Sequence, residues 1–164
     1  MKIVVINGPN LGRLGRREPS VYGRTTLAEI EAMLRAAAAR LDVELEFFQS
    51  DIEGELVRRI GEAADEADGM IVNPAAYTHT SVALRDAIAG SGLPCVEVHL
   101  TNTTAREPFR HSSLTAPVCV GQIMGFGPEG YRLALWGLVA RAKESGRRRS
   151  TARARRSSSE RKNA

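Results

Sequence analysis

The sequence predicts an α/β fold in which a parallel sheet carries helices on both faces. Short apolar runs at residues 2–6 (KIVVI), 69–73 (GMIVN) and 94–99 (PCVEVH) have the character of buried strands. Amphipathic segments of helical length separate them. Strands that alternate with helices at this spacing indicate parallel pairing, and five such units in a chain of 164 residues favour the three-layer, flavodoxin-like arrangement.

The helix after the first loop has the clearest sequence signals. Residues Thr25–Leu41 (TTLAEIEAMLRAAAARL) place apolar side chains at helical spacing. Thr25 or Thr26 is suited to cap the first turn, and Glu29 is placed to complete a capping box. The segment therefore predicts a helix with one buried face.

The remaining elements follow in chain order. We expect a strand at Val43–Phe48, a helix from Ser50 or Asp51 to about Ala67, a helix around Val82–Ala89, a fifth strand beginning at Pro117–Val120 and a helix at Glu129–Lys143. No internal repeat or second domain is visible, so residues 1–143 are interpreted as a single domain.

The net charge of +4 is unevenly distributed along the chain. Residues 144–164 hold eight arginines and lysines against two glutamates, a balance of +6, which leaves −2 for residues 1–143. The terminal segment is rich in Ser and Arg and is expected to be disordered. Since the folded body has no basic surplus, nucleic-acid binding is not expected as the main function.

The apolar content and the cysteines limit the class of protein. Apolar residues make up 43% of the chain, but no run approaches the roughly 18 that a membrane span requires. A cytoplasmic protein is therefore expected, without a membrane partner. Cys95 and Cys119 lie in apolar runs and are expected to be free core thiols rather than a disulfide or a zinc site.

The loop at residues 7–23 (NGPNLGRLGRREPSVYG) is unusually long for a compact domain. Loops of this length are commonly functional and often close over an active site. This one carries Arg13, Arg16 and Arg17, followed by the phenol of Tyr22. The pattern indicates a cationic cover over an anionic ligand.

Polar residues also follow the third and fourth strands, where a parallel sheet binds its ligands. Asn73 is followed by His79, and Glu97 and His99 end the next strand. Side chains two residues apart on a strand point the same way, so Glu97 is expected to orient or charge the imidazole of His99. The alternative for this pair is a buried ion pair at a subunit contact.

Several other site types fit less well. The first loop has neither a GxGxxG nor a GxxxxGK[ST] phosphate motif, and the three histidines lack metal-ligand spacing. Neither a cofactor nor a metal is expected. The only lysines of the body are Lys2 and Lys143, which cannot reach the strand ends to form a Schiff base. His79 remains open between a ligand contact and a histidine that only satisfies backbone groups.

Four motifs in this order, NGPNLGRLGRREPSVYG, NPAAYTHTS, EVHLTN and REPFRHSS, resemble type II 3-dehydroquinate dehydratase. The resemblance extends to about residue 143. It implies a hydro-lyase that converts 3-dehydroquinate to 3-dehydroshikimate in the shikimate pathway, without metal or cofactor, on a flavodoxin-like fold. It also implies self-association as a homododecamer built from trimers.

The resemblance implies a role for each matching residue. Tyr22 would be the base, Arg17 would hold it as phenolate, and His99, supported by Glu97, would protonate the leaving hydroxyl. The remaining matches would contact the substrate, its enolate or a bound water: Asn10, Asn73, His79, Asp86 (from a neighbouring chain), Leu100, Thr101 and Arg110, with Arg106 close by.

Two features depart from the family pattern. Ala75 stands where the family usually has Gly, and an added methyl would matter if that position needs a positive φ. The terminal segment after Lys143 has no counterpart. A non-catalytic protein that binds a small carboxylate on the same scaffold is the alternative function.

Overall fold

The structure is a computed structural model that describes residues 1–16 and 23–160, with side chains as far as residue 145. Its sheet consists of β1 (Lys2–Asn7), β2 (Glu44–Gln49), β3 (Gly69–Asn73), β4 (Cys95–His99) and β5 (Gly121–Met124). The strands lie in the order β2-β1-β3-β4-β5, and each neighbouring pair is parallel. The predicted five-stranded parallel sheet and flavodoxin-like order are confirmed.

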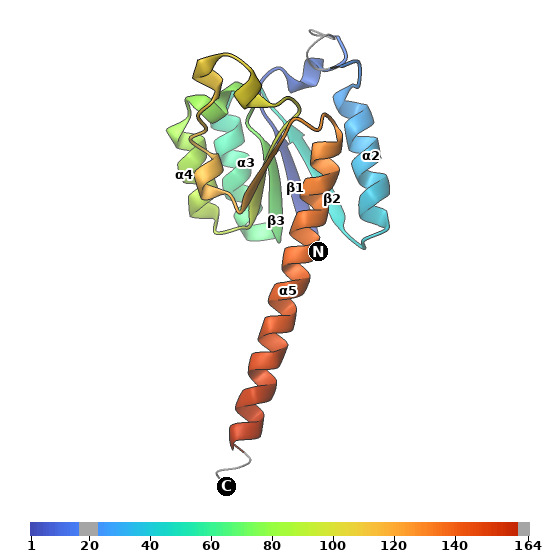
Figure 1. The fold of residues 1–164 in the computed structure, drawn as a ribbon, viewed down its shortest axis with the longest axis vertical. Helices are drawn as coiled ribbons and strands as arrows, with labels where there is room; N and C mark the ends of the chain where they lie inside the picture. The colour runs from blue at the N-terminus through green and yellow to red at the C-terminus, as the bar shows by residue number, and fades with distance from the viewer. Residues whose placement is uncertain (17–22, 161–164) are drawn as a thin grey trace.

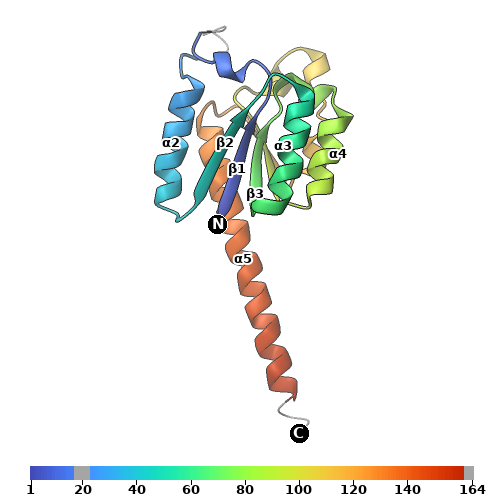
Figure 2. The ribbon, with the colours of Figure 1, turned by 180° about the vertical axis from the view of Figure 1, so that it is seen from behind.

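Four α-helices cover the sheet on its two faces. Helices α2 (Leu27–Ala39) and α5 (Glu129–Glu160) lie on one face, and α3 (Glu53–Glu66) and α4 (Val82–Ser91) lie on the other (Figures 1 and 2). The interior strand β1 contributes to both interfaces. Ile3 and Val5 belong to the cluster under α2 and α5, while Val4 and Ile6 belong to the cluster under α3 and α4. A continuous apolar run therefore fits a strand that is buried on both sides.

The first turn of α2 has the predicted capping box. The backbone N–H of Glu29 donates to the Thr26 hydroxyl at 3.2 Å, and the Thr26 N–H donates to the Glu29 carboxylate at 2.7 Å. The prediction for α3 was less accurate. Its N-cap is Ile52 rather than Ser50 or Asp51, because the Ser50 hydroxyl accepts the Ile52 N–H at 2.9 Å and so stabilises the turn before the helix.

The fifth strand begins later than predicted. Residues Ala116–Val118 form a short 3-10 helix with Pro117 in its first turn, and β5 starts at Gly121. Proline fixes a helical φ and lacks the N–H that a strand needs for pairing, which explains the shift. Cys119 therefore lies between elements and is half-buried, whereas Cys95 is fully buried. Both are free thiols, 3.7 Å apart at sulfur.

The last helix continues beyond the predicted end. We expected it to stop at Lys143, but α5 runs to Glu160 and extends away from the sheet (Figure 1). Residues 144–160 contain no proline and six arginines, which favour a helix, so the sequence is compatible with its continuation. Its buried residues, among those with described side chains, end at Val139. Within the described chain, none of the helices has the combination of length and apolar character needed for a membrane span.

Candidate active site

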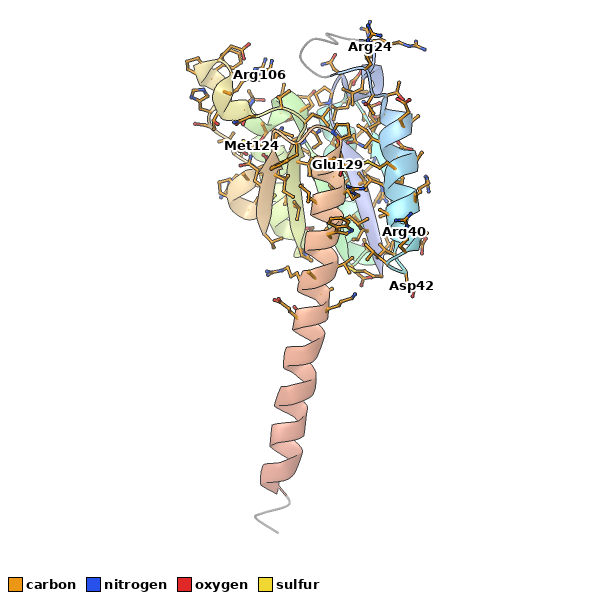
Figure 3. The ribbon with its side chains drawn as sticks, turned by 45° about the vertical axis from the view of Figure 1, so that its right-hand side comes forward. Arg24, Arg40, Asp42, Arg106, Met124 and Glu129 are labelled. Carbon is orange, nitrogen blue, oxygen red and sulfur yellow. The ribbon has the colours of Figure 1, made fainter. Side chains whose placement is uncertain are left out.

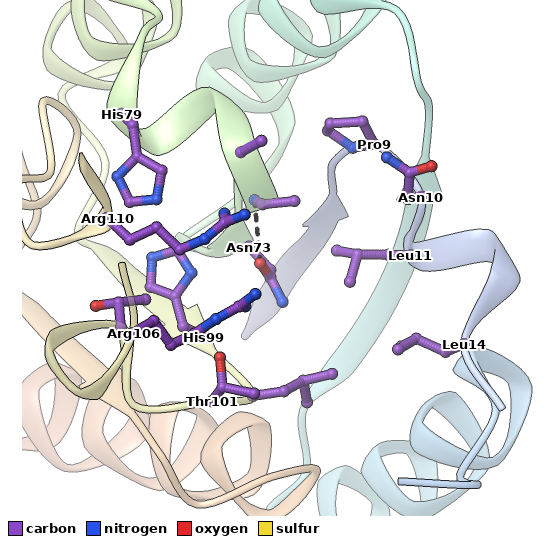
Figure 4. A pocket seen from close by; sticks show the side chains of 14 residues that line it. Pro9, Asn10, Leu11, Leu14, Asn73, His79, His99, Thr101, Arg106 and Arg110 are labelled. Atoms are coloured by element: carbon purple, nitrogen blue, oxygen red, sulfur yellow. Dashed lines mark hydrogen bonds between the residues drawn. The ribbon is translucent and has the colours of Figure 1, made fainter. Parts of the chain in front are cut away.

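A cavity of about 130 Å³ lies beyond the carboxyl ends of β1, β3 and β4 (Figure 4). A single water occupies about 10–15 Å³ on the same measure, so the space admits a small organic molecule. The cavity is lined by Pro9, Asn10, Leu11, Leu14, Asn73, Ala75, Ala76, His79, His99, Leu100, Thr101, Thr103, Arg106 and Arg110. This is the sheet edge at which parallel α/β folds bind ligands.

Most of the predicted site residues meet at this cavity. Those that line it are Asn10, Asn73, His79, His99, Leu100, Thr101 and Arg110. They come from the three loops that follow β1, β3 and β4, whose ends the sheet brings together. The register of the sheet explains part of this arrangement, since Asn7 and Asn73 are direct partners at the ends of β1 and β3.

The predicted Glu97–His99 pair forms on β4. The two side chains point to the same face of the strand, and His99 Nε2 lies 2.7 Å from Glu97 Oε1. Glu97 has no exposed surface and His99 is only 6% exposed. His99 lines the cavity whereas Glu97 does not, so the carboxylate lies behind the imidazole.

Several neutral groups donate to the buried Glu97 carboxylate. Gln122 Nε2 and the Thr78 hydroxyl donate to Oε1 at 2.8 and 2.9 Å, and the Thr115 hydroxyl donates to Oε2. Burial raises the pKa of Glu97, but the hydrogen bonds from His99, Thr115 and Thr78 outweigh it and hold the pKa below its usual value. Glu97 is therefore ionised at neutral pH.

Cationic and imidazole groups lie over one side of the cavity. Arg106, Arg110 and His79 gather around His99 in Figure 4. Arg110 Nε donates to Glu107 at 2.9 Å, and His79 Nδ1 lies 2.7 Å from the Ser112 carbonyl. These contacts fix the orientations of both side chains, and a guanidinium in such a position favours an anionic ligand.

The start of the first loop is held against the neighbouring loop. Gly8 lies so close to Pro74 that a Cβ would approach the Pro74 carbonyl oxygen to 2.6 Å. Asn10 has a φ of 66°, a conformation that Asn tolerates better than most residues, and its N–H donates to Asp51 at 2.8 Å. Glycine at position 8 therefore lets the Asn10 side chain reach the cavity.

A buried tyrosine, missed at the sequence level, supports the asparagines. The Tyr131 hydroxyl of α5 donates to Asn7 Oδ1 at 2.6 Å and accepts from Asn73 Nδ2 at 2.9 Å. Burial raises the pKa of Tyr131, with a smaller opposing effect from Asn73. The only signal in the sequence was a tyrosine on the inner face of an amphipathic helix, which looks like an ordinary core residue.

Ala75 has a positive φ, the case in which its methyl group was expected to matter. Its φ is 52°, its N–H donates to Asn73 Oδ1 at 3.2 Å, and it lines the cavity. An alanine in this region is strained relative to glycine. The alanine is accommodated with the Asn73 contact intact.

Of the predicted site residues that the structure describes, Glu97 and Asp86 do not line the cavity. Asp86 lies on α4 with its side chain 64% exposed, paired with Arg85 at 3.0 Å. Arg17 and Tyr22 lie outside the described residues.

Potential metal ligands and the lysine of β1 can be located in the described part of the chain. Within residues 1–16 and 23–160, no group of three or more His, Cys, Asp or Glu is placed to hold a metal ion. Lys2 begins β1, at the opposite end of the strand from the cavity, and its ammonium pairs with Glu46 and Glu66 at 2.8 and 2.9 Å.

Comparisons with known proteins all lead to one family. Residues 1–139 match the family model described as "Dehydroquinase class II". A 3-dehydroquinate dehydratase of Jannaschia sp. is 58% identical over 144 residues, which cover 88% of this chain and 97% of that protein. One from Sulfurovum sp. is 58% identical over 139 residues, covering 85% and 86%. The crystal structure of type II dehydroquinase from Butyrivibrio crossotus superimposes with a TM-score of 0.82 at 46% identity, covering 84% of this chain and 97% of that one.

Proposed function

The chain belongs to the class II dehydroquinase family, and on that basis we propose that it dehydrates 3-dehydroquinate to 3-dehydroshikimate. The reaction removes a proton from carbon 2, beside the ketone, to give an enolate. The carbon-1 hydroxyl then leaves as water, and the double bond forms between carbons 1 and 2. The enzyme therefore needs one base and one acid.

The observation that carries the proposal is the His99–Glu97 pair at the cavity wall. An imidazole whose one nitrogen is fixed by a buried carboxylate turns its other nitrogen to the ligand. When the ring is protonated, the nitrogen that faces the ligand also carries a hydrogen. His99 in this state is suited to protonate the departing hydroxyl.

The base in this proposal is Tyr22, which the resemblance identifies, with Arg17 as its partner. A phenol of pKa about 10 needs roughly 4 kcal/mol of stabilisation to be half ionised at pH 7. A guanidinium about 4 Å away supplies on the order of 4 kcal/mol at an effective dielectric constant near 20. One arginine is therefore sufficient in magnitude.

The other contacts in this proposal are those that the family resemblance implies. Asn10 and Asn73 position a water that stabilises the enolate oxygen, and Arg110 and His79 bind substrate hydroxyls. In the same proposal, the substrate carboxylate is held by the main-chain N–H groups of Leu100 and Thr101, which line the cavity. No step requires a metal or a lysine adduct.

The proposal extends to assembly and cellular role. Asp86 projects from α4 into solvent in the single chain, where a neighbouring subunit's site would receive it in a trimer. We place the enzyme in the cytoplasm, as a homododecamer of trimers, in the shikimate pathway toward chorismate and the aromatic amino acids.

The test follows the ultraviolet absorbance of the conjugated enone product. We expect turnover by the unmodified protein, and a loss in Tyr22→Phe larger than the roughly 10²–10⁴-fold typical of one acid–base group. Residual activity of Arg17→Ala should rise with pH toward about 10, because without the guanidinium the Tyr22 phenol ionises only near the ordinary tyrosine pKa. Absence of turnover in the unmodified protein, with tight binding of a small carboxylate, would refute the proposal. Near-normal turnover in Tyr22→Phe would indicate that a histidine, and not Tyr22, is the base.

A further inference from the structure

We propose that Thr78, Thr115 and Gln122 are positioning residues for this reaction, which fix Glu97 as the acceptor that orients His99. The inference rests on the proposed function, because it concerns how the acid of that reaction is prepared. The three residues come from the loop after β3, the loop before β5 and β5 itself, and they meet at one carboxylate. We call these three residues, together with Ser113, the donor cradle.

The donor cradle surrounds both oxygens of Glu97. Oε1 accepts from Thr78 at 2.9 Å, from Gln122 at 2.8 Å and from Ser113 at 3.1 Å, in addition to its contact with His99. Oε2 accepts from Thr115 and, at 3.3 Å, from Ser113. Thr78 and Thr115 have no exposed surface, so water does not replace their hydroxyls.

These donors fill the hydrogen-bonding capacity of the carboxylate, since with His99 there are five of them. Two carboxylate oxygens offer about four lone-pair sites. A proton could bind to Glu97 only if one donor were displaced, so the cradle opposes protonation of the carboxylate. The same donors oppose transfer of the shared hydrogen from His99 Nε2 to Glu97. Such a transfer would make His99 a weaker proton donor to the substrate.

The donors also determine which nitrogen of His99 is available to the ligand. Because an ionised Glu97 only accepts, the hydrogen on His99 Nε2 points to it, and Nδ1 remains for the cavity. The hydroxyl oxygens of Thr78, Ser113 and Thr115 also lie 2.7, 2.9 and 3.3 Å from one another. Each hydroxyl has one hydrogen, so a hydroxyl that donates to Glu97 can only accept from its neighbours. An acceptor fixed in this way does not reorganise during proton transfer.

The cradle lies next to a second cavity of about 380 Å³, which shares His79, His99, Thr103 and Arg110 with the first. Thr78, Ser113 and Gln122 contribute to its wall. The titratable and charged groups that face this region, and that could also respond to pH, are His79, Cys95, His99, Arg106, Arg110, His111 and Cys119.

A role in packing alone predicts the opposite mutational pattern from a donor role. Thr115→Val keeps the shape of the side chain and removes its hydroxyl, whereas Thr115→Ser keeps the hydroxyl and removes a methyl. A packing role makes the serine variant the worse of the two. A donor role makes the valine variant the worse, and the same comparison applies to Thr78.

The experiment measures kcat and KM for 3-dehydroquinate across pH in Thr115→Val, Thr115→Ser and Gln122→Met, with thermal melting to confirm folding. We expect kcat of Thr115→Val to fall on the order of tenfold with KM nearly unchanged, and Thr115→Ser to retain most activity. Loss of a donor raises the pKa of Glu97, so the acidic limb of the kcat profile should move upward by on the order of one pH unit in Thr115→Val and Gln122→Met.

Gln49→Met is the matched control, because Gln49 is a half-buried glutamine of the other edge strand whose amide donates to Gly8 and Asp51, not to Glu97. The acidic limb of its kcat profile should lie at the same pH as in the unmodified enzyme. Normal turnover by the unmodified protein, with unshifted limbs in folded Thr115→Val and Gln122→Met, would overturn this inference and leave the proposed function intact. The inference also fails if Thr115→Ser is more impaired than Thr115→Val. Absent turnover in the unmodified protein would refute the proposed function itself.

Discussion

Replacing Tyr131 with phenylalanine tests how far the site depends on a residue outside the cavity. The phenol oxygen lies between Asn7 Oδ1 at 2.6 Å and Asn73 Nδ2 at 2.9 Å, and none of these three residues is more than 2% exposed. Tyr131→Phe keeps the ring and removes only the oxygen. It therefore leaves one acceptor and one donor buried without their partner.

The magnitude follows from the two orphaned groups. Each buried polar group left without a partner costs roughly 1–3 kcal/mol, so the free energy of unfolding should fall by about 3 kcal/mol. For a chain of this size, that corresponds to a decrease in Tm of about 6–12 °C. Because Asn73 lines the cavity, its loosened amide should also lower kcat.

Urea unfolding followed by circular dichroism measures the first effect, and the enone assay measures the second. Tyr77→Phe is the matched control, since its hydroxyl donates to the Asp51 carbonyl at 3.0 Å from a half-buried position. Water can replace that contact, so a loss below about 1 kcal/mol is expected. If the two variants were equally stable, the buried Asn–Tyr–Asn arrangement would not constrain the fold as argued.

Three further predictions concern strain, pH and the last helix. Ala75→Gly should raise the free energy of unfolding by up to about 1 kcal/mol, because relief of the positive φ exceeds the entropy that glycine adds to the unfolded chain; a lower Tm would contradict this. Burial raises the pKa of Tyr131 in the folded state. The contribution of its neutral phenol to the free energy of unfolding is therefore complete below about pH 10 and is lost as the pH rises above that value. Unfolding between pH 10 and 11 should show a steeper loss of stability, by up to about 1.4 kcal/mol per unit, in the unmodified protein than in Tyr131→Phe. Truncation after Lys143 should leave Tm and turnover unchanged, since the buried residues of α5 end at Val139; loss of either would show that the terminal helix is structural.

The sheet was predictable because its sequence signals are local and strong. The run KIVVI alternates between two apolar clusters, and GMIVN was predicted with its observed bounds. The errors fall where local signals conflict. Pro117 interrupts an apolar run and delays β5, and the serine before α3 caps a turn instead of the helix.

The cavity was predictable from topology, whereas its supports were not. The carboxyl ends of neighbouring parallel strands must meet, so Asn73 and His99 could be placed together before any coordinates existed. Tyr131 reaches the same edge from 58 residues beyond Asn73, and no local pattern specifies which inward-facing ring also carries a structural hydroxyl. The donors to Glu97 were missed for the same reason, since threonine and glutamine near strand ends are common.

The direction of α5 has a practical consequence for handling the protein. The helix leaves the body at the amino-terminal ends of the strands, opposite the cavity (Figure 3). Residues 140–160 add about 30 Å at 1.5 Å per residue. A tag, dye or surface linker joined after α5 would therefore stand well clear of the cavity in the single chain. An electrode, bead or optical trap coupled there would leave the entrance facing free solution.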